Sequence, residues 1–82
     1  MKMSADEILC EMTAVCRETF GRPSLDLTMT TRQDDVEEWD SLAHIQLVLA
    51  LGKRFALKFT TKEVMGWTDV GSIVRCIEGK LA

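Results

Sequence analysis

The chain has 82 residues, of which 46% are hydrophobic and 28% charged, and its formal net charge at neutral pH is −3. A chain of this length forms one small domain, 1–82, with a modest core, and its apolar content is too high for a disordered protein. The acidic balance argues against nucleic-acid binding, which needs clustered Lys and Arg. The sequence has no apolar run long enough for a bilayer and no signal-peptide pattern at its start, so we expect a cytoplasmic protein with no membrane contact.

The three cysteines, Cys10, Cys16 and Cys76, are odd in number and never spaced as CxxC. With only one histidine in the chain, we predict no metal site. All three cysteines fall within helical patterns. We interpret them as small apolar residues that fill the interior of a protein kept in a reducing compartment.

The first predicted element is an amphipathic helix over 4–20. Ser4 followed three residues later by Glu7 is a capping-box pattern. Apolar residues recur from there at three- and four-residue steps up to Phe20. Gly21 and Pro23 then end the helix.

The periodicity is lost over 22–40, and apolar residues are scattered there among polar ones. They are Leu25, Leu27, Met29, Val36 and Trp39. Connections this long are uncommon in small domains and are usually ordered or functional. The alternation at 25–28 also admits a short strand. We interpret the segment as a loop whose apolar side chains hold it against the helices.

The next predicted helix, 41–55, has two apolar stripes, whereas a surface helix needs only one to face its core. At 100° per residue, one stripe comprises His44, Leu47, Val48, Leu51 and Phe55. The other comprises Leu42, Ile45 and Leu49. The remaining face, expected to be wetter, comprises Ala43, Gln46, Ala50, Lys53 and Arg54. Ser41 lies between the two stripes at the start of the helix.

Two further helices complete the pattern. A short one spans 60–65, is capped by a threonine and ends at Gly66. The last begins after Thr68 or Asp69 and runs to about Leu81 at helical apolar spacing. Phe59 and Trp67 are expected in or near the core. The predicted fold is therefore all-α: a small four-helix bundle of three main helices and one short helix, with a long first loop.

The hydroxyl of Ser41 raises the question of function. Asp40 and Ser41 are both residues that cap helices, but Asp40 alone suffices, which would leave the serine hydroxyl exposed. His44 lies one turn further on, yet nucleophilic catalysis also requires an orienting acid and an oxyanion hole, and neither is evident. We therefore predict no catalytic residue at this position. A phosphodiester on Ser41 would instead be stabilised by the N–H groups of the helix N-terminus.

These features occur together in a known family. Asp40-Ser41-Leu42 opens an apolar helix about forty residues into the chain, after an amphipathic helix and a long loop. The run LVLAL at 47–51, Phe55, and a short helix before a final amphipathic one complete the pattern. Over essentially its whole length, the sequence resembles the acyl carrier proteins.

The resemblance implies that Ser41, within the motif formed with Asp40 and Leu42, receives 4′-phosphopantetheine from coenzyme A through a phosphopantetheinyl transferase. The thiol of this arm would hold an acyl group as a thioester. The protein would then catalyse nothing and would deliver the acyl group, as a monomer, to acyl-loading and acyl-processing enzymes.

Partner enzymes would dock on the second stripe, Leu42, Ile45 and Leu49, with Glu37 and Glu38 offering charge to basic partners. The alternative is that loop 22–40 covers this stripe. An unmodified helical interaction module using the same stripe is a further possibility.

The sequence departs from the fatty-acid carriers in its charges. Those carriers usually have acidic residues along the second helix, but 41–55 contains none. Five acids precede the serine instead and leave a net +2 on the rest of the chain: Asp34, Asp35, Glu37, Glu38 and Asp40. Together with Trp39, this favours a carrier of a specialised, polyketide-like pathway over the fatty-acid one. The paired glycines typical of aminoacyl or peptidyl carriers are absent before Ser41, although that cargo stays open.

Overall fold

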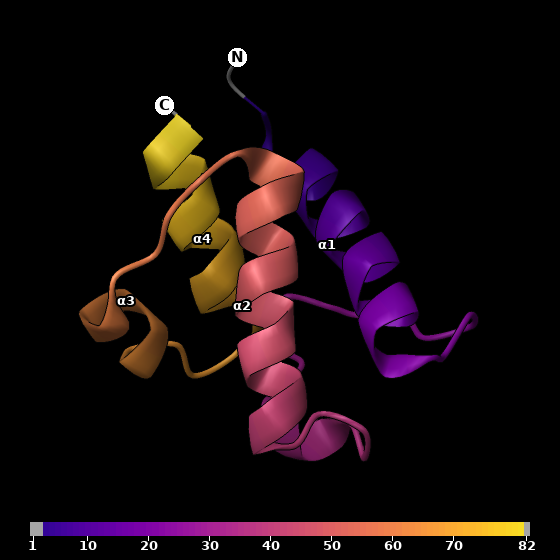
Figure 1. The fold of residues 1–82 in the computed structure, drawn as a ribbon. Helices are drawn as coiled ribbons and strands as arrows, with labels where there is room; N and C mark the ends of the chain where they lie inside the picture. Colours follow the sequence, from indigo (N-terminus) through magenta and orange to yellow (C-terminus); the bar gives the residue numbers. More distant parts are fainter. Residues whose placement is uncertain (1–2, 82) are drawn as a thin grey trace.

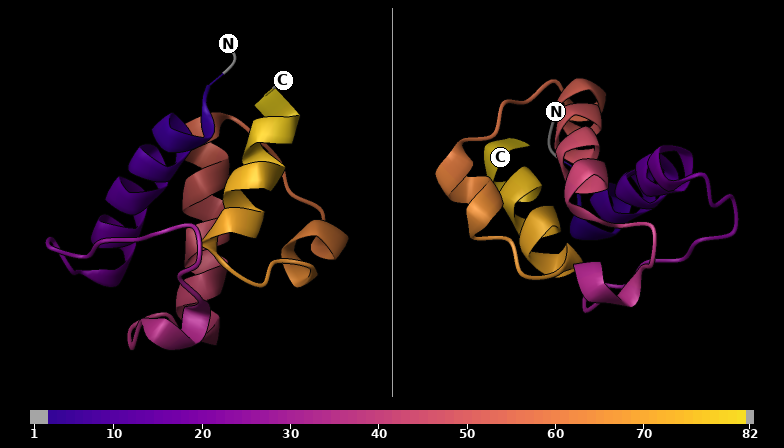
Figure 2. Two further views of the ribbon diagram at one scale, coloured as in Figure 1. Left: turned by 180° about the vertical axis from the view of Figure 1, so that it is seen from behind. Right: turned by 60° about the horizontal axis from the view of Figure 1, so that its bottom comes forward.

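In a computed structural model, which describes residues 3–81, the chain is all-helical with no strand in that range. The elements are α1 (Ala5–Phe20), the 3₁₀ turn η1 (Gln33–Asp35), α2 (Ser41–Phe55), α3 (Thr61–Met65) and α4 (Val70–Leu81). α1 packs against both α2 and α4, and the short α3 lies on the side of the molecule away from α1 (Figures 1 and 2). The predicted four-helix fold with a long first loop is confirmed. Within residues 3–81, no helix combines the length and the apolar character needed to cross a bilayer.

The ends of α1 follow the predicted signals. The Glu7 amide donates to Ser4 Oγ at 3.2 Å, and the Ser4 amide donates to Glu7 Oε1 at 3.0 Å, which completes the capping box. At the other end, Gly21 adopts the left-handed conformation with φ of 66°. The Arg22 amide then reaches back to the Arg17 carbonyl at 2.9 Å, closing the last turn.

The core combines all the long helices with the first loop. Its buried side chains are Ile8, Met12, Val15, Cys16, Phe20, Leu25, Leu27, Val36, Trp39, Ala43, Leu47, Leu51, Val70, Ile73, Val74 and Ile77. Four of these belong to the segment 22–40, which confirms that apolar side chains hold this loop onto the helices. Phe59 and Trp67 are half-buried against the same core, as predicted, with ring centroids 5.2 Å apart.

The backbone of the first loop is bonded to α4 instead of forming the short strand that alternation at 25–28 admitted. The Val70 amide donates to the Thr31 carbonyl at 2.8 Å, and the Gly71 amide donates to the Met29 carbonyl at 2.7 Å. These amides belong to the first turn of α4 and have no partner within the helix. The loop therefore satisfies the helix end and is held in place by it.

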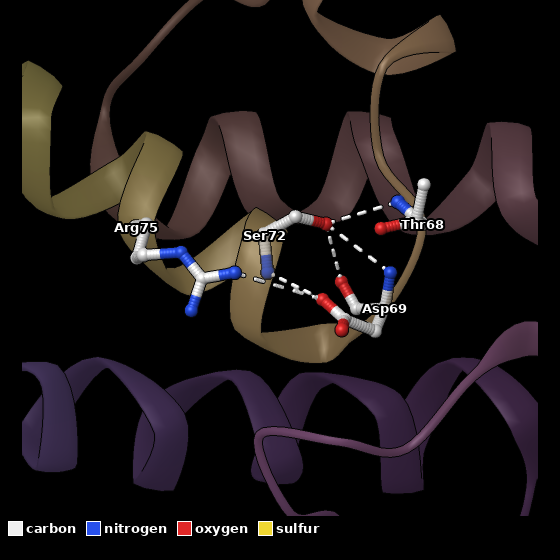
Figure 3. Close-up of polar contacts among 4 residues, drawn as sticks. All are labelled: Thr68, Asp69, Ser72 and Arg75. Atoms are coloured by element: carbon white, nitrogen blue, oxygen red, sulfur yellow. Dashed lines mark hydrogen bonds and ion pairs between the residues drawn. The ribbon is translucent and has the colours of Figure 1, made fainter.

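Asp69, one of the two predicted candidates, caps α4. Its Oδ1 accepts from the Ser72 amide at 2.8 Å, and Ser72 Oγ in turn accepts from the amides of Thr68 and Asp69 (Figure 3). Arg75 lies 3.9 Å from the same Asp69 oxygen. The exchange of bonds between Asp69 and Ser72 orders the turn that joins Trp67 to α4.

The short α3 buries none of its residues. Glu63 holds it in place in two ways. Glu63 Oε1 accepts from the Thr60 amide at 2.8 Å within a capping box, while Oε2 lies 2.9 Å from Lys80 Nζ and 3.7 Å from Cys76 Sγ of α4. The bond from the Thr60 backbone, and then that from Lys80, lowers the pKa of Glu63 to about 2. The polar contacts of Glu63 therefore hold α3 in place, whereas the longer helices are held by buried side chains.

Two sequence expectations are wrong. On α2, Ala43 is buried and Ala50 half-buried, because α1 packs against the side of α2 that was assigned to solvent; only Gln46, Lys53 and Arg54 of that set are exposed. Cys10 of α1 is exposed and fills no interior space. Cys16 of the same helix is buried, and Cys76 of α4 is half-buried. Burial raises the pKa of the Cys16 thiol to about 12.

Candidate attachment site at the start of α2

Ser41 is the first residue of α2 and its side chain is exposed. The residue before it, Asp40, has extended backbone geometry and acts as the N-cap: its Oδ1 accepts from the Ala43 amide at 2.8 Å, and its carbonyl accepts from the His44 amide at 2.9 Å. The Ser41 hydroxyl has no hydrogen-bond partner within residues 3–81. Capping by Asp40 thus leaves that hydroxyl in solvent beside the first N–H groups of the helix.

His44, one turn further along α2, contacts Trp39 and not Ser41. Trp39 Nε1 donates to His44 Nδ1 at 2.9 Å, and the two rings stack with their centroids 6.0 Å apart. Trp67 meets the imidazole edge-on, with the ring centroids 6.1 Å apart. Burial lowers the pKa of His44, which favours the neutral ring that accepts from Trp39. The hydrogen bond between nucleophile and base that a catalytic serine needs is not among the contacts of the described chain.

Sequence reasoning treated Trp39 and His44 separately and missed this pair. Their spacing carried a signal, however. For a helix capped by Asp40, Trp39 is the residue before the cap and His44 is the fourth helical residue, which are the two positions that pack together in a hydrophobic staple. With its side chain only 4% exposed, Trp39 anchors the chain immediately before Asp40 and Ser41.

The second stripe of α2 is open to solvent. Its side chains have exposed fractions of 65% for Leu42, 59% for Ile45 and 64% for Leu49. The alternative in which loop 22–40 covers this stripe is therefore wrong; the loop packs its apolar residues against the core instead. The three side chains form an exposed apolar strip that starts directly beside Ser41.

Met65 at the end of α3 extends the apolar surface and was not singled out from the sequence. Its side chain is 80% exposed, and it lines a hollow of about 250 Å³ between α2 and α3 together with Ile45 and Leu49. The only hint in the sequence was the shortness of the predicted helix 60–65. A helix of one or two turns cannot bury every apolar side chain that it carries.

The five acids before Ser41 are all exposed, along the turn η1 and the residues after it. Glu38 pairs with Arg22 at 3.2 Å, and Asp35 Oδ2 accepts from the Arg32 amide at 2.8 Å, whereas Glu37 projects into solvent. In Figure 1 this turn lies beside the starting end of α2. Negative charge is therefore concentrated at the end of α2 that carries Ser41 and is absent along the helix itself.

The fold and this site define a small all-α protein with an exposed serine at the start of its second long helix. The structure is similar to the solution NMR structure of a holo acyl carrier protein from Geobacter metallireducens, with a TM-score of 0.85 and 31% sequence identity. The alignment covers 90% of this chain and 85% of that one. Comparisons with protein-family models and with curated protein sequences gave no match. On the structural comparison, the chain belongs to the acyl carrier protein family and has the fold of a carrier.

Proposed function

We propose that Ser41 carries 4′-phosphopantetheine and that the thiol of this arm holds an acyl group as a thioester for delivery to partner enzymes. The observation that supports this most directly is the exposed hydroxyl of Ser41, which has no hydrogen-bond partner in the described range 3–81 and stands next to a cap that Asp40 provides by itself. The similar structure is that of a holo protein, which agrees with a modified form of this chain.

The surroundings of Ser41 fit a phosphodiester. The first amides of α2 point toward the helix start, and the helix dipole adds positive potential there, so a negative group on Ser41 Oγ is stabilised. The Asp40 carboxylate is held by the Ala43 amide. The bound arm supplies a thiol that carries the acyl group; the protein supplies the anchor, its orientation and the surface that partners recognise.

We further propose that Leu42, Ile45 and Leu49 contact the phosphopantetheinyl transferase and the acyl-processing enzymes, and that Glu37 and Glu38 face basic side chains of those partners. Apolar contact contributes affinity, while the acids steer the approach and select partners. Because the acids precede Ser41 and α2 has none, the partner's basic residues should lie beyond the serine and not along α2. This arrangement supports a specialised, polyketide-like pathway, with the fatty-acid pathway as the alternative.

The attachment is tested by intact mass after incubation with coenzyme A and a broad-specificity phosphopantetheinyl transferase. The wild-type protein should gain one phosphopantetheine, and Ser41→Ala should gain none. Ser4→Ala is the matched control, because Ser4 is also an exposed serine at a helix start, and it should be modified like the wild type. A wild-type protein that stays unmodified under conditions that label another carrier would overturn the proposal.

The exposed stripe also supports a second candidate, an unmodified module that binds a partner through α2. The same mass measurement separates the two functions. We propose in addition that residues 1–82 act as a single, monomeric carrier unit, since the stripe must be free for partners. Sedimentation of the modified protein at the mass of one chain is the expected result.

A further inference from the structure

The residues on either side of Asp40 and Ser41 are joined through their side chains. Trp39 Nε1 donates to His44 Nδ1 at 2.9 Å, and the planes of the two rings are inclined by only 25°. The bond runs from the end of the first loop to the first turn of α2. It therefore encloses the residue proposed to carry the arm. We call these two side chains the Trp39–His44 pair.

Both members of the pair are anchored in the folded protein. The centroid of the Trp39 ring lies 5.7 Å from that of Phe20 at the end of α1, and the Trp39 amide donates to the Val36 carbonyl at 3.0 Å. His44 is half-buried, and its amide donates to the Asp40 carbonyl at 2.9 Å. The pair thus ties the first turn of α2 to α1 and to the loop that precedes the helix.

The Asp40 cap leaves part of this turn unbonded. Asp40 satisfies the Ala43 amide, but within residues 3–81 the amides of Ser41 and Leu42 have no hydrogen-bond partner, as is usual at a helix start. Helix ends with few bonds open most readily. A contact between the residue before the cap and the fourth helical residue fixes the angle at which the chain enters the helix. The hydrogen bond of the Trp39–His44 pair adds direction to this contact.

From this geometry we propose that Trp39 and His44 are positioning residues for the transfer of phosphopantetheine to Ser41. The inference rests on the attachment proposed above. The transfer forms a bond from Ser41 Oγ to a phosphorus atom of coenzyme A. The pyrophosphate bond of that molecule breaks, its nucleotide part leaves, and the serine proton passes to a base of the transferase. The attacking oxygen must lie about 3 to 3.5 Å from the phosphorus atom and be aligned with the leaving group. The pair holds the backbone that presents this oxygen.

The exposed stripe and the Trp39–His44 pair control different parts of the reaction. Ile45 and Leu49 lie one and two turns beyond Ser41 and are exposed, so they remain available to the transferase when the first turn opens. Loss of the pair therefore leaves binding almost unchanged and lowers the fraction of bound protein whose serine is aligned. Such a change lowers kcat and kcat/KM together, whereas a change that only weakens binding raises KM.

The test measures kcat and KM for phosphopantetheine transfer from coenzyme A by a broad-specificity transferase, using intact mass at early times. His44→Leu keeps an apolar side chain but removes the acceptor. It should lower kcat about three- to tenfold and leave KM within about twofold of the wild type, as expected for the loss of one hydrogen bond. His44→Asn should restore most of kcat, because its Oδ1 is bonded to Cγ as Nδ1 is and accepts from Trp39.

A double-mutant cycle tests whether the two side chains act as one unit. Trp39→Phe removes the donor and should lower kcat as His44→Leu does. The double variant Trp39→Phe/His44→Leu should be no slower than either single variant. Trp67→Phe is the matched control, because Trp67 meets His44 edge-on and its Nε1 has no hydrogen-bond partner within residues 3–81. It should leave kcat within about twofold of the wild type.

A general loss of stability is separated from positioning by Leu47→Ala, which removes a fully buried side chain and should leave kcat unchanged while circular dichroism shows the protein folded. An unchanged kcat in His44→Leu, additive losses in the double variant, or an equal loss in Leu47→Ala would each overturn the inference while the attachment at Ser41 stands. A wild-type protein that gains no mass would remove the proposed function together with this inference.

Discussion

The indole of Trp39 and the imidazole of His44 meet across the first turn of α2, with Trp39 Nε1 donating to His44 Nδ1 at 2.9 Å. Between them in the sequence stand Asp40, which caps the helix, and Ser41, whose hydroxyl has no hydrogen-bond partner among residues 3–81. The aromatic pair therefore fixes the chain on both sides of a residue that remains exposed. This separation of roles gives His44 a hydrogen-bond partner other than the nearby serine.

His44, the single histidine of the chain, makes stability depend on pH near neutrality. Burial lowers its pKa in the folded protein, so the unfolded chain, with an ordinary value of 6.5, binds the proton more readily. The stabilisation is present above pH 6.5 and is lost as the pH falls below it. Protonation of Nδ1 also removes the acceptor for Trp39.

We therefore expect the free energy of unfolding in urea to fall between about pH 7.5 and pH 5.5 in the wild type. The fall should be smaller in His44→Gln, whose amide oxygen accepts from Trp39 without titrating. His44→Ala should lose about 1 kcal/mol at neutral pH with the hydrogen bond. An equal pH dependence in the wild type and His44→Gln would show that the imidazole does not control this transition.

At the scale of elements, α2 presents one apolar stripe to the core and another to solvent. Because Ile45 is exposed, Ile45→Glu should leave the free energy of unfolding within about 0.5 kcal/mol of the wild type. The same change should slow phosphopantetheine transfer by about tenfold or more, since it introduces a charge into the proposed docking surface. Initial rates of modification and urea unfolding of the same samples provide the measurement.

The matched change on the other stripe is Leu47→Ala. Leu47 is completely buried, and its truncation should cost about 2 to 5 kcal/mol of stability. Under conditions where this variant remains folded, its modification rate should stay close to that of the wild type. A large stability loss in Ile45→Glu, or a normal modification rate, would show that the exposed stripe was assigned the wrong role.

The short helix α3 buries none of its residues and depends on polar contacts for its position. Glu63 joins it to α4 through Lys80, so Glu63→Gln should speed hydrogen exchange of the α3 amides while the amides of α4 remain protected. The contribution of this carboxylate is present above its ordinary pKa of 4.5 and is lost as the pH falls toward about 2. Glu18→Gln, at an exposed site of α1, should leave exchange in α3 unchanged.

At the scale of the whole molecule, the first loop passes next to the start of α4 (Figure 2). The amides of Val70 and Gly71 donate to its carbonyl groups there. A Cβ on Gly71 would lie 2.7 Å from the Met29 carbonyl oxygen, so Gly71→Ala must displace the loop or break this bond. We expect a loss of about 1 to 3 kcal/mol in urea unfolding.

Gly79→Ala provides the comparison within the same helix. Among residues 3–81, and apart from the neighbouring residues and the backbone of the helix itself, nothing lies within 4 Å of the added methyl group. Alanine also has the higher helix propensity, so this variant should gain up to about 1 kcal/mol. Equal effects at the two positions would indicate that the contact between the loop and α4 does not hold the molecule together.

The bounds of α1 and α2, the capping box at Ser4 and Glu7, and the Asp40 cap were predictable because they depend on residues only a few positions apart. The acyl carrier resemblance was likewise carried by order and spacing along the chain. Predictions failed where a distant element decided the outcome. Ala43 is buried on the side of α2 that faces α1. Cys10 is exposed, whereas α1 buries the side chains that face α2 and α4.

The sequence by itself determined the helices, the family resemblance and the serine with which its second long helix begins, since periodicity, caps and motifs are local properties. Only the tertiary structure decided that Leu42, Ile45 and Leu49 are exposed. It also decided that Trp39 donates a hydrogen bond to His44, and that Lys53 and Lys58 border the same hollow. The physical reason is that burial, hydrogen bonding and charge proximity depend on which surfaces meet in space. A chain with two apolar stripes on one helix is compatible with more than one such arrangement.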